Sequence, residues 1–177
     1  MAPHQPPAND RAATAADDER FMDVALAHSE AALARGDCPV AAVIVIDGAI
    51  AGVGSNRVAT GGDPTAHAEV EAIRDACAKL GTSRLAGATL YSAMEPCPMC
   101  CWAIREAGIG RVVLGARHAG MRRIDYGRYS MEKLLEMTGA TLDLVTGVRV
   151  QECEAIRRRW KHWVEPPRPG GDSGKAR

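Results

Sequence analysis

Residues 40–54 read VAAVIVIDGAIAGVG, and they indicate how the sheet begins. Its first part, residues 40–46, is a nearly continuous apolar and β-branched run, which is typical of a buried strand. Asp47-Gly48 is a strong signal for a tight hairpin turn, so residues 49–54 are expected to return as a second strand. The sheet therefore starts with an antiparallel pair.

Helical and strand patterns alternate on both sides of this hairpin, in the order αββαβαβαβα. Alternation of this kind implies right-handed crossovers and a largely parallel sheet, to which the hairpin adds one antiparallel edge. A helical crossover between the fourth and fifth strands makes that pair parallel. We expect an α/β domain, a three-layer αβα sandwich around a five-stranded mixed sheet with strands 4 and 5 parallel. The sequence predicts helices at 19–35, 63–80, 98–107, 130–137 and 150–163, and strands at 40–46, 49–54, 88–92, 111–115 and 142–145.

The composition is that of one ordinary globular domain. The chain has 177 residues, of which 46% are hydrophobic and 25% charged, and its formal net charge is zero. A zero net charge disfavours non-specific binding of nucleic acid, which usually leaves a basic footprint. Residues 1–18 are rich in Ala, Pro and Asp and are predicted to be a disordered leader, and residues 166–177 a flexible tail. The folded unit is expected to span residues 19–165.

Six cysteines raise the question of disulfides. The N-terminus is polar and acidic without an apolar signal core, and no apolar run is long enough to span a membrane. These features predict a cytoplasmic protein that does not associate with membranes. In a reducing compartment a C-x-x-C motif indicates metal or redox chemistry rather than a disulfide.

Two short segments carry the chemistry: His67-Ala68-Glu69 and Pro96-Cys97-Pro98-Met99-Cys100. An imidazole and two thiolates are suitable ligands for zinc. Two cysteines three residues apart lie on one side of a helix start, where free N–H groups favour thiolates. Three protein ligands leave one coordination position open, which is typical of catalytic zinc. The sequence therefore predicts a Zn²⁺ site formed by His67, Cys97 and Cys100.

Glu69 is the candidate proton carrier beside this site. Residues i and i+2 diverge in mid-helix, but from a first turn His67 and Glu69 can reach one centre. Zinc would make a bound water acidic near neutral pH, and Glu69 would move its proton to a ring nitrogen and to the leaving amine. The pattern H-x-E followed by P-C-x-x-C is typical of zinc deaminases. The predicted reaction converts the amino-bearing carbon of a cyclic amidine to a carbonyl and releases ammonia.

At these residues the chain resembles the cytidine/nucleobase deaminase superfamily, from about Phe21 to Glu165. The resemblance implies that His67, Cys97 and Cys100 hold zinc, that Glu69 shuttles protons, and that the enzyme is a homodimer that pairs through helices beside the active site. It rests on Pro39-Val40-Ala41-Ala42-Val43, Gly54-Ser55-Asn56-Arg57, Asp63-Pro64-Thr65-Ala66-His67-Ala68-Glu69, Thr89-Leu90-Tyr91 and Glu95-Pro96-Cys97-Pro98-Met99-Cys100.

The resemblance also suggests substrate contacts. Asn56 matches a family asparagine that hydrogen-bonds the base; alternatively, it closes its own turn. Trp163-Val164-Glu165 is similar to the aromatic-then-acidic end that closes the pocket in fungal cytosine deaminase, although Trp160 and Trp163 could instead anchor the core or an interface. The predicted substrate-binding residues are Asn56, Ala68, Glu95, His118, Trp163 and Glu165.

Three branches share the motif: tRNA adenosine deaminases, guanine deaminases and free cytosine deaminases. The tRNA branch has a G-A-R-D-A-K-type stretch after the fourth strand, whereas residues 115–121 here read GARHAGM. An acidic residue typical of guanine deaminases is not obvious there. The C-terminal layout favours the free-base branch, with cytosine, guanine or an aminotriazine as substrate.

Two other readings stay open from the sequence. The zinc could be purely structural, with Cys101 as a fourth ligand. The run Arg157-Arg158-Arg159, with Lys161, could bind tRNA phosphates, although a basic last turn also complements the helix dipole, which we prefer.

Overall fold

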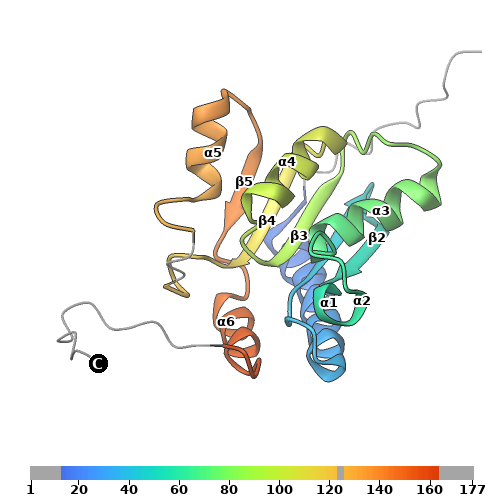
Figure 1. Cartoon of the computed structure of the whole chain (residues 1–177). Coiled ribbons are helices and arrows are strands. Elements are labelled where there is room, and N and C mark those ends of the chain that lie inside the picture. The colour runs from blue at the N-terminus through green and yellow to red at the C-terminus, as the bar shows by residue number, and fades with distance from the viewer. Residues whose placement is uncertain (1–12, 123–125, 164–177) are drawn as a thin grey trace, which may run out of the picture.

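The computed structural model describes residues 13–122 and 126–163. A five-stranded sheet runs through it in the order β2-β1-β3-β4-β5 (Figure 1). The strands are β1 (Ala41–Ile46), β2 (Ala49–Ser55), β3 (Thr89–Met94), β4 (Arg111–Ala116) and β5 (Asp143–Thr146). The helices are α1 (Ala15–Arg35), α2 (Val58–Gly61), α3 (Ala68–Leu80), α4 (Pro98–Ala107), α5 (Met131–Thr138) and α6 (Val150–Arg158).

The sheet is mixed, and β4 and β5 are parallel as predicted. The expectation of a largely parallel sheet with one antiparallel edge is wrong in one respect. Strand β1 is antiparallel to β3 as well as to β2, so two of the four pairings are antiparallel. Strand β1 is followed by β2 through a tight hairpin on one side, and the chain then enters the sheet again as β3 on the other side of β1.

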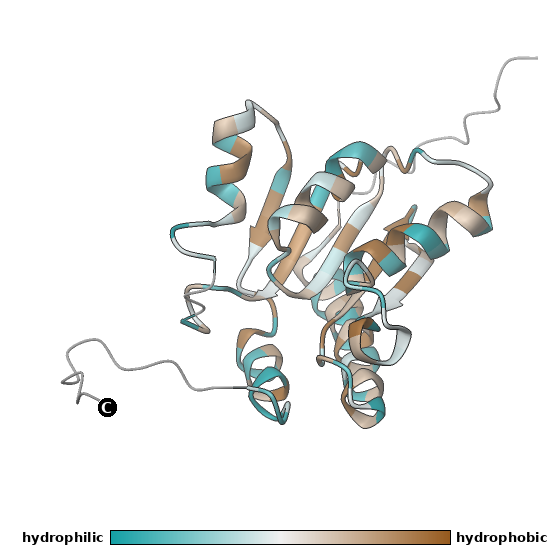
Figure 2. Cartoon of the chain, in the orientation of Figure 1, coloured by the Kyte–Doolittle hydropathy of each residue, from teal (hydrophilic) through white to brown (hydrophobic). Residues whose placement is uncertain are grey.

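Helices cover both faces of the sheet, which gives the three-layer αβα sandwich. Helix α1 packs on β1 and β3 and meets α6, which lies on β4, whereas α3 and α4 lie side by side on the other face (Figure 1). Figure 2 shows hydrophobic residues along the strands, and hydrophobic and hydrophilic residues alternating around the helices. The sheet is therefore the buried middle layer of the domain, and the loops at one end of it carry the candidate functional site.

The folded unit begins before residue 19. Helix α1 starts at Ala15, because Thr14 caps it and exchanges hydrogen bonds with Asp17 in a capping box. Asp18 is buried and its carboxylate receives two 2.8 Å hydrogen bonds from Arg111. The prediction of a disordered leader is therefore wrong for residues 15–18, which belong to α1. Residues 1–12 and the predicted tail at 166–177 lie outside the described residues.

Helix α3 starts five residues later than the Asp63-Pro64-Thr65 signal suggested. Asp63 accepts hydrogen bonds from the N–H and hydroxyl of Thr65, both at 2.7 Å, and so forms a local turn. His67 has an extended backbone and is the N-cap residue of the helix. The short helix α2, which was not expected, fills the connection between β2 and this turn.

Two glycines let α3 lie directly on β2. A Cβ atom at Gly54 would come within 2.2 Å of the Ala68 carbonyl oxygen, and one at Gly52 within 2.6 Å of the Ala72 carbonyl oxygen. Any side chain at these positions would push the helix off the strand. The two glycines therefore set the distance between strand β2 and the helix that carries His67 and Glu69.

The predicted last helix, 150–163, is shorter in the structure. Helix α6 ends at Arg158, and Trp163 follows in a turn, where its N–H donates to the Trp160 carbonyl at 2.8 Å. In the part of the chain that the structure describes, no helix is both long and apolar enough to cross a membrane.

Candidate zinc centre and its pocket

The three predicted zinc ligands come from the N-terminal ends of two neighbouring helices. His67 is the N-cap of α3, Cys97 is the N-cap of α4, and Cys100 lies in the first turn of α4. Pro98 follows Cys97 at the first helical position, where its fixed φ and missing N–H cost nothing. Because α3 and α4 pack side by side, their two starts meet beyond the end of β3.

The spacing of the ligand atoms fits zinc. The Sγ atoms of Cys97 and Cys100 are 3.6 Å apart, and His67 Nδ1 lies 3.6 Å and 3.5 Å from them. Zinc with Zn–S bonds of about 2.3 Å and a Zn–N bond of about 2.0–2.1 Å in tetrahedral geometry holds its ligands about 3.5–3.8 Å apart. Among the described residues, these three make the only such group of metal-binding side chains.

The electrostatics of the three ligands suit a cation. A hydrogen bond with Cys100 lowers the pKa of Cys97 to about 4, although burial opposes this, and His67 contributes further. The pKa of Cys100 is raised, because its proton is held in the bond with Cys97 and its thiol is buried. The hydrogen bond with Cys97 raises the pKa of His67. Since a zinc ligand must be deprotonated, metal binding would displace the remaining protons.

Cys101 does not complete this group. It is buried, but its sulfur lies 2.9 Å from the Tyr129 hydroxyl, and it is not among the clustered ligands. Burial raises the pKa of Cys101 to about 12. All six cysteines are free thiols. The described residues therefore give three protein ligands, as a catalytic zinc site has, and not the four of a structural site.

Glu69 lies in the first turn of α3, two residues after His67, and is only 3% exposed. Burial raises the pKa of Glu69 above its ordinary value. The Ser92 hydroxyl, from β3, lies 3.1 Å from Glu69 Oε1. A buried carboxyl group with a raised pKa is suited to act as a general acid–base group.

A small pocket of about 50 Å³ brings these groups together with most of the predicted substrate contacts. Asn56 and Ala68 both line it. Asn56 Oδ1 accepts a hydrogen bond from the Val58 N–H at 3.2 Å, so the asparagine does close its own turn. Its amide nitrogen has no hydrogen-bond acceptor among the described residues and can serve a ligand. The other lining residues are Val40, His67, Glu69, Met94, Glu95, Cys97, His118 and Tyr126.

Glu95 lines the pocket, but its carboxylate is already fully engaged by the protein. It accepts hydrogen bonds from the backbone N–H of His118 (2.8 Å) and of Met131 (2.9 Å), and from the Arg117 guanidinium. Burial opposes ionisation, yet these bonds lower the pKa of Glu95. The structure thus gives this carboxylate a different role from the expected substrate contact. It links residues 117, 118 and 131 to the end of β3, just before Cys97.

His118 lines the pocket, as expected, together with Tyr126, and Tyr129 packs beside both; neither tyrosine was predicted from the sequence. The ring of Tyr126 is 4.4 Å from that of His118, and the ring of Tyr129 is 5.8 Å away. The chain has only three tyrosines, and two of them fall in this one loop. That local concentration was the available signal.

Trp163 and Glu165 are the remaining predicted contacts. Trp163 is not among the residues that line the pocket; the Arg157 guanidinium lies over its ring, 5.3 Å from the centroid, and over that of Trp160 at 4.8 Å. The structure therefore favours a packing role for both tryptophans over the expected lid. Glu165 lies outside the described residues.

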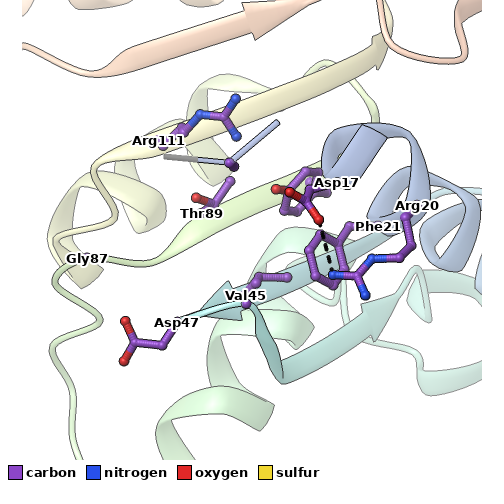
Figure 3. A pocket seen from close by; sticks show the side chains of 11 residues that line it. Asp17, Arg20, Phe21, Val45, Asp47, Gly87, Thr89 and Arg111 are labelled. Atoms are coloured by element: carbon purple, nitrogen blue, oxygen red, sulfur yellow. Dashed lines mark hydrogen bonds and ion pairs between the residues drawn. The ribbon is translucent and has the colours of Figure 1, made fainter. Parts of the chain in front are cut away.

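A larger cavity, of about 350 Å³, opens at the opposite end of the sheet, beside the start of β3 (Figure 3). Three of its four charged lining residues are in ion pairs: Arg20 with Asp17 at 3.5 Å, and Arg111 with Asp18 and Asp143 outside the lining, while Asp47 is the fourth. No group of metal-binding residues lines it in the described part of the chain. It does not compete with the zinc centre as a candidate active site.

The comparisons with known proteins agree with this site. Residues 15–116 match the family model described as the cytidine and deoxycytidylate deaminase zinc-binding region, and the chain belongs to this family. The family is one of zinc-binding deaminases, which are hydrolases acting on C–N bonds.

The relatives include tRNA-specific adenosine deaminases and a guanine deaminase. The tRNA-specific adenosine deaminase of Haemophilus influenzae is 39% identical over 142 residues, which are 77% of this chain and 78% of that protein. The tRNA-specific adenosine deaminase of Agrobacterium fabrum is 44% identical over 58% of this chain and 67% of its own length. The guanine deaminase of Bacillus subtilis is 54% identical, but over only 45% of this chain and 51% of that enzyme.

Similar solved structures include both kinds of enzyme. One from studies of A-to-I editing of transfer RNA at the wobble position has a TM-score of 0.68 and 36% identity, and covers 77% of this chain and 98% of its own. One of guanine deaminase from Nitrosomonas europaea has a TM-score of 0.70 and 25% identity, over 90% of this chain and 95% of its own.

Proposed function

We propose that this protein hydrolyses the exocyclic amino group of a free nucleobase or similar aminoheterocycle, such as cytosine, guanine or an aminotriazine, and releases ammonia. The observation that carries this proposal is the buried Glu69 beside three zinc-ligand atoms, at the floor of a small pocket with aromatic sides. Zinc, when held by His67, Cys97 and Cys100, supplies an activated water molecule.

Glu69 accepts a proton from the attacking water and passes it to a ring nitrogen of the substrate. A C–O bond forms at the amino-bearing carbon while the ring takes up the proton. Glu69 then moves the second proton to the amine, the C–N bond breaks, and the products are a carbonyl and ammonia. The amide nitrogen of Asn56 is placed to donate to a carbonyl or ring nitrogen of the same base.

The C-terminal basic run offers little support for RNA binding, which favours a small substrate. The basic run of α6 presents little free charge: Arg158 pairs with Glu154 at 3.0 Å, Arg159 pairs with Glu30, and Arg157 is buried against two tryptophans. A surface that grips the RNA backbone needs cations free to replace counterions at phosphates.

Deamination of adenosine in tRNA is the second candidate. The relatives support it, since several tRNA-specific adenosine deaminases are 38–44% identical to this chain. Arg57 is exposed one residue after Asn56, and with Arg128 it could meet an RNA strand at the pocket mouth. The two candidates share the zinc centre and Glu69, and differ in the substrate alone.

An ammonia-release screen of the zinc-loaded protein tests the choice. The panel contains cytosine, guanine, adenine and melamine, the matching nucleosides, and unmodified tRNA whose inosine content is measured. We expect turnover of at least one free base, none of nucleosides, and no inosine. Inosine formation without turnover of any free base would contradict the proposal and favour the tRNA candidate. The Glu69→Gln variant is the control for contaminating activity.

We also propose that the protein is a cytoplasmic homodimer that pairs through α4, next to the site. Met99 and Trp102 on this helix are large hydrophobic residues that are 37% and 45% exposed. Light scattering after size-exclusion chromatography should give twice the chain mass of 18.8 kDa. Trp102→Glu should shift the protein to the monomer; a monomeric wild type would contradict the proposal.

A further inference from the structure

His118 and Tyr126 lie together on the wall of the pocket that contains Glu69 and Asn56. Their ring centroids are 4.4 Å apart and the rings are tilted by 45°. His118 is only 4% exposed, so its ring is part of the protein interior as well as of the pocket lining. A flat molecule bound in this pocket beside Glu69 therefore lies close to these two rings.

This pair is held in place by the segment that carries the zinc ligands. The His118 N–H donates to Glu95, two residues before Cys97, at 2.8 Å. The Tyr129 ring packs 5.8 Å from His118 and 6.1 Å from Tyr126, and its hydroxyl donates to the Pro96 carbonyl at 2.7 Å. The rings therefore keep a fixed position relative to the metal ligands.

We propose that His118 and Tyr126 form the wall against which the ring of the substrate packs, and that Tyr129 positions this wall. The proposal rests on the proposed function and sharpens its substrate class to a flat, free heteroaromatic base. Stacking of a base on an aromatic side chain contributes about 1–3 kcal/mol and accepts many ring types. The pocket is small, about 50 Å³, which suits a flat ring.

Variants at Tyr126 test the wall. Tyr126→Leu keeps an apolar side chain but removes the aromatic face, and should raise KM for the preferred free base roughly 10- to 100-fold, with a smaller change in kcat. Tyr126→Phe, the conservative control, keeps the face and should stay within about threefold of wild type, since only the hydroxyl is lost. Zinc content and melting temperature should be unchanged in both.

Tyr129→Phe tests the positioning role. The ring remains, but the hydrogen bond to Pro96 is lost, so KM should rise about 3- to 10-fold while kcat and zinc content are retained, as loss of one hydrogen bond predicts. A residue that only stabilises the fold would lower the melting temperature without changing KM.

Binding measurements distinguish a failure of the proposed wall from a failure of the proposed function. Cytosine, guanine, adenine and melamine are titrated by calorimetry into zinc-loaded Glu69→Gln protein, with and without Tyr126→Leu. Weaker binding in the double variant supports the wall even if wild type releases no ammonia, in which case only the proposed function fails. Equal binding or equal KM with and without the Tyr126 ring overturns the wall although turnover stands. Failure of all four bases to bind overturns both.

Discussion

The two ends of the same sheet bury charged and polar groups in different ways. At the start of β3, Asp18, Arg111 and Tyr91 satisfy one another: two Arg111–Asp18 bonds at 2.8 Å and one from Tyr91 to Asp18 at 3.1 Å. At the end of β3, His67, Cys97 and Cys100 lie 3.5–3.6 Å from one another, and Glu69 has a raised pKa.

The difference shows which buried polar cluster serves chemistry. A network in which each group is paired stabilises a fold and has nothing left to offer a ligand. A cluster whose groups converge on one point, with soft ligands and a carboxyl group of perturbed pKa, is typical of an active site. Variants at the two ends should therefore separate activity from stability.

The largest expected effect is at the zinc end. Cys97→Ala removes one of three ligands, so bound zinc should fall from one equivalent to well below half, and ammonia release should fall by at least about 10³-fold. Zinc is measured by mass spectrometry on the purified protein. The neighbouring Cys101→Ala is the matched control and should keep the metal; an active, metal-free Cys97→Ala protein would refute ligation.

Arg111→Met at the opposite end should have the reverse profile. It leaves the Asp18 carboxylate buried without its cation, which costs about 3 kcal/mol of unfolding free energy. Urea unfolding measures the loss, while kcat/KM of the folded fraction should stay within about twofold, since no group near Glu69 changes. Exposed Arg84→Met is the control. A loss of activity that exceeds the loss of folded protein would contradict the separation of the two ends.

Gly54→Ala tests how the zinc end is held together. Its methyl group would collide with the backbone of α3, so the variant should be less stable by about 1–3 kcal/mol and should bind zinc more weakly through the displaced His67. Gly110→Ala has nothing within 4 Å of the added Cβ and an ordinary φ, and so serves as the size-matched control. Equal stability of the two variants would show that α3 can shift without cost.

The smallest expected effect concerns acid stability. Burial alone would raise the pKa of Asp37, but hydrogen bonds from the Thr60 N–H and hydroxyl, helped by Arg35, lower it below 3.8. A carboxyl group with a lowered folded-state pKa adds stability above its unfolded pKa, and this is lost as pH falls below about 4. Asp37→Asn should therefore reduce stability at pH 7 and change it less at pH 3. An equal effect at both values would refute the linkage.

Features that depend on short stretches of sequence could mostly be predicted. The hairpin at Asp47-Gly48, the zinc ligands and the parallel β4–β5 pair all follow from spacing and turn residues. It did not reveal that Glu95 binds backbone groups of His118 and Met131, which are 23 and 36 residues away, because such contacts exist only after folding. The helix start was misplaced for a similar reason, since Asp63 forms its own turn. No sequence motif marks Tyr126 as a pocket residue, and only the tertiary structure brings it to the pocket.

The central claim is that Glu69 moves protons at a zinc site formed by His67, Cys97 and Cys100. The most direct measurement is zinc content together with ammonia release for Glu69→Gln, with the substrate found by the screen. We predict one zinc per chain, as in wild type, and ammonia release lower by about 10³-fold or more, since a positioned general acid–base group contributes about 10²–10⁴-fold. Turnover within tenfold of wild type in the zinc-loaded variant would contradict the claim.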